Sequence, residues 1–145
     1  MHFEALSLVN GRAFGDTVSA PAGGGCVLMG QNASLTLLNV RIRNCQAQGR
    51  GGAISVGSGS TLVIKNTVIS GNNAGLDGGG IYLYRSLMES DNSSVSTNGA
   101  LNNGGGIYLD ASSMSAVASL IYGNIANRGV YVCGCVRVCM CQDNT

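Results

Sequence analysis

The stretch Gly78-Gly79-Gly80-Ile81-Tyr82-Leu83 decides the fold, because variants of it recur along the chain. A glycine pair or triplet also precedes the apolar residues Val27, Ile54 and Ile107, so that successive copies start 27, 27 and 26 residues apart. A second row has almost the same spacing and consists of Ala47, Ala74, Ala100 and Ala126. Two rows with one period indicate an internal repeat of 26 to 27 residues.

The composition favours a chain that turns often. The 145 residues include 23 Gly, and Gly costs about 1 kcal/mol at a helical position. Eight Lys and Arg residues balance seven Asp and Glu residues, and the net charge of +1 gives no basic footprint of nucleic-acid binding. The apolar runs are only a few residues long, far below the roughly 18 residues of a membrane span. We therefore expect neither a nucleic-acid partner nor a membrane span.

Each repeat contains short segments in which apolar residues alternate with others. Ile54-Ser55-Val56 and Ile107-Tyr108-Leu109 have this period of two, which predicts strands. Two more runs follow in each unit, such as Leu62-Val63-Ile64 and Val68-Ile69, so we expect three short strands per repeat. With Gly and Asn at the corners, one repeat can close one coil of a solenoid whose coils stack about 4.8 Å apart. The predicted fold is all-β, a right-handed parallel β-helix of about five coils.

The whole chain, 1–145, is expected to form a single β-helix domain. Residues 1–22 would contain an incomplete first coil, 23–129 the regular coils, and 130–145 a Cys-rich terminal strand and tail. The interior is predicted to be a narrow apolar column, to which four residues contribute one structural ladder: Val27, Ile54, Ile81 and Ile107.

A leucine-rich repeat is the competing architecture, because its period of 20 to 29 residues overlaps the period found here. That repeat needs a regular line of leucines and usually a helical or tightly turned return. Here the leucines give way to Met88 and Met114, and the return segments are β-branched or rich in Ser. The pattern therefore favours the β-solenoid.

Two motifs resemble the repeat of a known group of proteins. Gly51-Gly52-Ala53-Ile54 and the run from Val68 to Asn72 are similar to the paired G-G-A-[ILV] and F-x-x-N motifs of polymorphic outer membrane proteins and related right-handed parallel β-helices, with Val68 or Ile69 in place of Phe. The resemblance covers residues 1 to about 131. It implies a secreted or surface-exposed protein with an adhesive or structural role.

Candidate catalytic residues are sparse. His2 is the only histidine and Lys65 the only lysine. A glycoside hydrolase needs two carboxyl groups about 5 to 9.5 Å apart, and on the repeat register Asp77, Asp91 and Asp110 occupy different positions, so that no two acids stack on adjacent coils. We therefore predict no catalytic centre and no cofactor, and a carbohydrate-cleaving β-helix is kept as the alternative.

Asparagines recur at two positions of the repeat, as Asn39, Asn66 and Asn92 and as Asn72, Asn98 and Asn124. An inward Asn at a solenoid corner can bond its own backbone and the next coil, which would satisfy buried turn groups. We interpret both rows as structural ladders rather than as ligand-binding residues.

Tyrosines form a third row. Tyr82 and Tyr108 lie between inward apolar residues and should point outward, and Tyr131 can extend the row. Such a surface aromatic row can stabilise a sheet by stacking, or it can bind sugar rings or another protein. The stabilising interpretation is favoured.

Six cysteines fall into two groups. Cys26 and Cys45 occupy repeat positions and can be small buried residues or partners in a disulfide. The other four have C-x-C spacing, which fits a zinc knuckle poorly but leaves disulfides, a four-thiolate metal site and free thiols open; they are Cys133, Cys135, Cys139 and Cys141. We favour disulfides that join facing segments or another subunit.

The compartment is suggested by two acceptor sequences for N-glycosylation, at Asn32 and Asn92, and by the number of cysteines. Residues 1–10 contain no readable signal peptide, so we expect a segment of a longer exported protein. The function expected is a structural or adhesive extracellular module that assembles head to tail into a filament. Glycans or other surface proteins are further candidate partners, and carbohydrate binding or cleavage is the alternative function.

Overall fold

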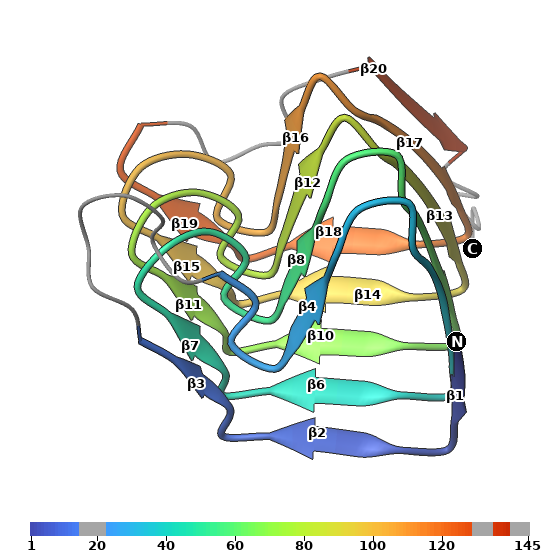
Figure 1. Cartoon of the computed structure of the whole chain (residues 1–145), viewed down its shortest axis with the longest axis horizontal. Helices are drawn as coiled ribbons and strands as arrows, with labels where there is room; N and C mark the ends of the chain where they lie inside the picture. Colours follow the sequence, from blue (N-terminus) through green and yellow to red (C-terminus); the bar gives the residue numbers. More distant parts are fainter. Residues whose placement is uncertain (15–22, 129–134, 140–145) are drawn as a thin grey trace, which may run out of the picture.

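The structure, a computed structural model, describes residues 1–14, 23–128 and 135–139, the last segment by its backbone alone. These residues form 20 strands and no helix. The strands wind into a column in which every sheet pairing is parallel (Figure 1). The prediction of an all-β parallel solenoid is confirmed.

Each coil contributes one strand to each of four sheets, which form the sides of the column. Sheet A contains β1 (His2–Glu4), β5 (Ser34–Leu38), β9 (Thr61–Lys65), β13 (Leu87–Asp91), β17 (Ser113–Val117) and β20 (Cys135–Cys139). Sheet B contains β2 (Ser7–Val9), β6 (Arg41–Arg43), β10 (Val68–Ser70), β14 (Ser94–Ser96) and β18 (Leu120–Tyr122).

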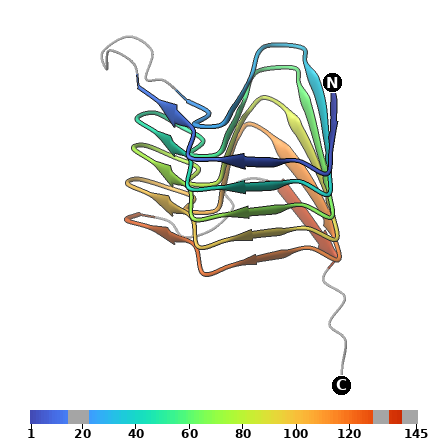
Figure 2. The same ribbon diagram turned by 90° about the horizontal axis from the view of Figure 1, so that it is seen from below.

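The other two sheets are built in the same way. Sheet C contains β3 (Arg12–Ala13), β7 (Gln46–Ala47), β11 (Asn73–Ala74), β15 (Gly99–Ala100) and β19 (Ile125–Ala126). Sheet D contains β4 (Val27–Met29), β8 (Ile54–Val56), β12 (Ile81–Tyr84) and β16 (Ile107–Asp110). Seen after a 90° turn, the coils are stacked layers (Figure 2).

Two details of the expected coil differ from the structure. Each coil has four strands instead of three, because the alanine row forms a two-residue strand, too short to give an alternating pattern. Four coils are complete, running from β4 to β19, and about five were expected. The four are preceded by the three strands β1 to β3 and followed in sheet A by β20.

All four corners of the coil use one residue in the left-handed backbone region. In the corner between sheets A and B this residue is Ala5, Asn39, Asn66, Asn92 or Ala118, with φ between 44° and 55°. The corner between sheets C and D uses only glycine, at Gly24, Gly51, Gly78 and Gly104. Because Gly and Asn enter this region most readily, their recurrence sets the period of the fold.

Each of the three glycines in the motif before sheet D is required for its own physical reason. Its first residue, such as Gly78, has a positive φ of 67°. The second, Gly79, has no room for a Cβ, which would collide with the carbonyl oxygen of Gly105 in the next coil. A Cβ at the third, Gly80, would lie 2.6 Å from the carbonyl oxygen of Gly106 in the next coil and 3.1 Å from the side-chain nitrogen of Asn98. The motif therefore records one turn and two close approaches between coils.

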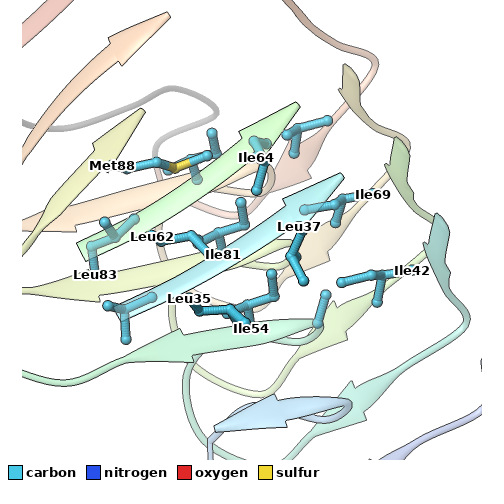
Figure 3. Packing of buried hydrophobic residues seen from close by; sticks show 14 of the residues in the cluster. Leu35, Leu37, Ile42, Ile54, Leu62, Ile64, Ile69, Ile81, Leu83 and Met88 are labelled. Carbon is cyan, nitrogen blue, oxygen red and sulfur yellow. The ribbon is translucent and has the colours of Figure 1, made fainter. Parts of the chain in front are cut away.

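The interior of the column is filled by stacked aliphatic side chains (Figure 3). Val27, Ile54, Ile81 and Ile107 pair in register along sheet D, and the last three are fully buried. Leu35, Leu62 and Met88 stack in the same manner on sheet A. Repetition of the same apolar positions in each coil makes the core continuous from one coil to the next.

Candidate functional site

A ladder of asparagines lies inside the column, at the corner between sheets B and C. Asn72, Asn98 and Asn124 are 0 to 6% exposed. The Asn98 Oδ1 atom accepts hydrogen bonds from the backbone N–H of Asn72 at 3.0 Å and from its side-chain Nδ2 at 2.9 Å. The Asn98 Nδ2 atom donates to the carbonyl oxygen of Ile69 and to Asn124 Oδ1. Each amide therefore satisfies polar groups of two coils in a place that water does not reach.

A disulfide takes the place of this ladder in the first complete coil. Cys45 is the position equivalent to Asn72, and Cys26 is equivalent to Ala53 and Gly80. The Sγ atoms of Cys26 and Cys45 are bonded, and Cys45 is fully buried while its N–H donates to Asn72 Oδ1 at 2.9 Å. Of the open interpretations for these two cysteines, the disulfide is the one found.

The second asparagine row differs from the first, although the sequence suggested one role for both. Asn66 and Asn92 are exposed at the corner between sheets A and B, with left-handed backbones. Asn92 Nδ2 donates to Asn66 Oδ1 at 2.7 Å on the surface. This row therefore serves the backbone conformation of the corner, and the interior beside it is bonded by the hydroxyls of Thr67, Ser93 and Ser119.

A polar cluster lies on the outward side of sheet D and on the corner before it. We call it the tyrosine cluster, and it consists of Arg50, Asp77, Tyr82, Asn103, Tyr108 and Asp110. The Tyr82 hydroxyl donates to Asp110 Oδ2 at 2.8 Å, and the rings of Tyr82 and Tyr108 stack with centroids 5.9 Å apart. The cluster thus joins successive coils on the outside, as the asparagines do on the inside.

Three polar residues of the tyrosine cluster come from equivalent corner positions. Arg50, Asp77 and Asn103 each precede the left-handed glycine of their coil. Arg50 Nε donates to Asp77 Oδ2 at 3.1 Å, and Asp77 Oδ1 accepts from the side chain of Asn103 at 3.0 Å. The Arg50 guanidinium also lies 5.2 Å from the Tyr82 ring centroid, within the range of a cation–π contact.

The environment of the tyrosine cluster changes two pKa values. Burial raises the pKa of Tyr82 well above its usual range, and the hydrogen bond to Asp110 raises it further, while Arg50 opposes both. Burial alone would lower the pKa of Arg50, but the hydrogen bond to Asp77 and the nearby negative charges outweigh it, and the net direction is upward. Tyr82 therefore stays neutral and Arg50 charged, which suits a fixed hydrogen-bonding network.

The expectation of an exposed tyrosine row is wrong for Tyr82. This side chain alternates with Ile81 and Leu83 and leaves the apolar column, but only 6% of it is exposed. Arg50 and Tyr108 cover it, and the half-buried Tyr108 is the outer member of the pair. Tyr131, the third expected member, lies outside the described residues.

A shallow groove follows the corner between sheets D and A across three coils. It has a volume of about 580 Å³, and its lining includes Gly59, Arg85 and Leu87 but no carboxylate. Ser86 also lines it, and Ser86 Oγ is the buried side-chain polar atom without a hydrogen-bond partner among the described residues. The groove thus lacks the paired acids that hydrolysis of a glycoside requires.

The remaining candidates from the sequence do not meet at one site. Asn32 and Asn92 are both exposed at corners, as glycosylation requires, and their modification stays a prediction. Cys133 and Cys141 lie outside the described residues, and Cys135 and Cys139 are known there only as backbone of β20. Over the described ranges, no three His, Cys, Asp or Glu side chains gather as metal ligands. The same part of the chain has no helix long and apolar enough to cross a membrane.

The sequence analysis found the tyrosines of this cluster but missed its corner row, because that row contains three different residue types. Arg50, Asp77 and Asn103 share no chemistry that a repeat search would detect. Their common position, one residue before the glycine motif, is the signal that could have revealed them. Asp110 was noticed as an acid, but the pairing of Tyr84 with Asp110 in sheet D is what places it one coil from Tyr82.

Comparison with known proteins agrees with this architecture. The family model described as right-handed beta helix region matches residues 17–145. This match supports the β-helix repeat but not the polymorphic outer membrane protein type to which the motifs are similar. No curated protein and no solved structure matches the chain significantly. With nearly its whole length covered by the family model, the chain belongs to the right-handed β-helix family.

Proposed function

We propose that this chain is a structural module of an exported protein, a rigid column that performs no reaction. The observation that carries the proposal is that Asp77 and Asp110 hold neighbouring coils together. Both carboxylates are already bonded to side chains of the neighbouring coil, Asp77 to Arg50 and Asn103 and Asp110 to Tyr82. The disulfide between Cys26 and Cys45 and the exposed Asn32 and Asn92 sequons support an oxidising compartment.

The test separates a structural from a catalytic role of these acids. Asp77→Asn and Asp110→Asn are compared with the wild type in denaturant unfolding, in a glycan array and in turnover assays with polysaccharides. We expect a lower free energy of unfolding for both variants, because each weakens a bond between coils, and no turnover by any of the proteins. Turnover by the wild type that is lost in Asp110→Asn would contradict the structural proposal.

Carbohydrate binding is the second candidate, and it is favoured by one feature. Tyr108 is half-buried and lies in the row of sheet D next to Asp110, so an aromatic ring and a carboxylate are close to the same surface. Sugars bind by stacking on such rings while polar groups orient them. Saturable binding of a glycan by the wild type, lost in Tyr108→Ala with an unchanged melting temperature, would establish this candidate instead.

The ends of the column support head-to-tail association as part of the structural role. Of the described strands, β1 and β20 are the outer strands of sheet A, and an outer strand presents unpaired N–H and C=O groups. Parallel pairing of β1 of one copy with β20 of another would extend sheet A, and the same contact would repeat into a filament. Thiols of the Cys-rich segment would then lie near the joint.

Light scattering with and without reductant tests the filament. We expect the average mass to rise with protein concentration, and Cys133→Ser with Cys139→Ser to remove any part of the rise that depends on oxidation. A protein that stays monomeric at high concentration under oxidising conditions would rule the filament out.

A further inference from the structure

Two adjacent sides of the column carry charged pairs of opposite sign. On sheet B, Arg41 and Arg43 flank the buried Ile42 of β6, so both arginines are on the outward face, and both are exposed. Arg12 on β3 adds a cation around the next corner. No Asp or Glu occurs in the described strands of sheets B and C. The charged residues in the described strands of sheets B and C are therefore all basic.

Sheet A, the adjacent side, carries the matching acids. Glu89 and Asp91 flank the buried Ser90 of β13, and both are exposed on the outward face. They line a hollow of about 240 Å³, together with Lys65 of the neighbouring strand, which is paired in register with Asp91. Two carboxylates thus face one ammonium group in this hollow, and its net charge is negative.

The acidic pair and the basic pair have the same geometry. In each, the two charged residues are separated by one residue on a parallel strand, so their Cα atoms are about 6.6 Å apart. None of the four has an ion-pair partner within the described part of the chain, where the salt bridges found are His2 with Glu4 and Arg50 with Asp77. Two like charges at this distance on one strand repel each other, and an opposite pair at equal spacing would offset that repulsion.

We propose that a second copy of this chain docks side by side, with the Arg41 and Arg43 face of one copy against the Glu89 and Asp91 hollow of the other. One copy cannot satisfy itself, because sheets A and B are different sides of the same column, joined at the Asn39, Asn66 and Asn92 corner (Figure 1). Arginine favours such a contact since its planar guanidinium bonds carboxylates in a bidentate manner. The contact is lateral and goes beyond the head-to-tail association proposed above.

The contact joins two different surfaces. In a pair of copies, one copy therefore keeps a free basic face and the other keeps a free acidic hollow. Such a heterologous contact repeats until it closes a ring or grows into a ribbon. The outward face of sheet B is small, with three residues in each of five strands, or roughly 10 by 24 Å from the spacing within and between strands. This is well below the roughly 800 Å² per partner of a stable interface, so the contact should be weak and sensitive to salt.

Charge reversal tests the proposal with the whole chain. The average mass is measured by sedimentation velocity at 20 and 300 mM salt for the wild type, R41E/R43E, E89R/D91R and an equimolar mixture of the two variants. We expect the wild type to gain mass at 20 mM salt relative to 300 mM salt, each variant alone to show this salt-dependent association at least tenfold more weakly, and the mixture to recover the wild-type behaviour. Recovery follows because one variant is acidic on both faces and the other is basic on both.

The control is R128E, which removes an exposed positive charge at the far end of the column and should leave the association unchanged. Thermal unfolding of every variant checks the fold, which exposed side chains should not affect. A wild type whose mass is independent of salt would overturn the proposal. So would loss of association in R41E/R43E without recovery in the mixture, because the arginines would then meet an anion other than Glu89 and Asp91. Head-to-tail pairing of backbones should be insensitive to all four substitutions.

Discussion

The two asparagine rows are the same residue at the same period in two different environments. Asn72, Asn98 and Asn124 lie inside the column and bond groups that have no access to water. Asn66 and Asn92 lie on the surface with left-handed backbones, and their bond to each other is exposed. A repeated residue therefore does not identify its own role, because burial decides whether the side chain or the backbone conformation is what matters.

The largest expected effect is Asn98→Ala on the inner row. It removes the acceptor of the Asn72 N–H, one of the two acceptors of Asn72 Nδ2, which keeps its bond to the Ile42 carbonyl, and the side-chain donor to the Ile69 carbonyl. A buried group left without its partner costs about 1 to 3 kcal/mol. We expect the free energy of unfolding to fall by about 3 to 5 kcal/mol in urea titrations.

Asn66→Ala is the matched control on the outer row. It gives up a surface hydrogen bond and puts alanine into the left-handed region, at a cost of about 1 kcal/mol. If the two alanine variants lost equal stability, the distinction between the inner and outer rows would be wrong.

The disulfide gives a second way to test the inner row. Cys26→Ala with Cys45→Ala removes a link that closes a loop between residues 19 apart, and about 3 kcal/mol should be lost in denaturant unfolding. Cys26→Ala with Cys45→Asn instead recreates the pair formed by Ala53 and Asn72. Its new amide can accept from the N–H of Gly11 and donate to Asn72 Oδ1, because Gly11 is the equivalent residue one coil earlier.

The asparagine variant should therefore recover about 1 to 2 kcal/mol of the loss, corresponding to one or two internal hydrogen bonds. An asparagine variant no more stable than the double alanine would mean that position 45 cannot act as a member of the inner row.

Much of the fold follows from the sequence because the same physical requirement is repeated in every coil. Ile54, Ile81 and Ile107 are predicted inward residues and are buried in register. The fourth strand was not predicted, because two residues such as Asn73 and Ala74 cannot display an alternating pattern. Local periodicity reports strands of three or more residues and misses shorter ones.

The tyrosine cluster could be predicted only in part. The outward direction of Tyr82 follows from its place between Ile81 and Leu83. Its burial depends on Arg50, whose side chain comes from the corner between sheets C and D in the preceding coil and lies over the Tyr82 ring. Alternation along a strand predicts which way a side chain points, but it does not predict whether a side chain from a neighbouring loop covers it.

The environment of Tyr82 is intermediate between those of the two asparagine rows, since its side chain faces outward and is nevertheless buried. Tyr82→Phe tests what this environment contributes. The substitution removes a hydrogen bond to a carboxylate, and because Asp110 is half exposed we expect a loss of about 1 kcal/mol. The raised pKa of Tyr82 also makes the free energy of unfolding depend on pH. Since the folded state holds the proton more tightly, the stabilisation is complete below pH 10, the usual pKa of tyrosine, and is lost as the pH rises above it.

Unfolding measured between pH 8 and 11 checks this prediction. The wild type should lose stability above pH 10 more steeply than Tyr82→Phe, and Tyr84→Phe, on the exposed end of the same strand, should behave like the wild type. Equal slopes for all three proteins would mean that the Tyr82 hydroxyl is not buried in a bond to Asp110.

The smallest effect is expected on the outer row, where the sequence departs from its own pattern. Ala118 occupies the corner position of Asn66 and Asn92 with a φ of 46°, a conformation that costs alanine roughly 1 kcal/mol. Ala118→Gly relieves this strain, which by itself would raise the free energy of unfolding by up to about 1 kcal/mol. The greater conformational entropy of glycine in the unfolded chain reduces the gain. Ala118→Asn should gain at least as much, since its amide can also bond to Asn92 as Asn92 does to Asn66. Paired melting curves decide, and a gain for asparagine but none for glycine would show that the outer row stabilises through its side chains and not through the backbone.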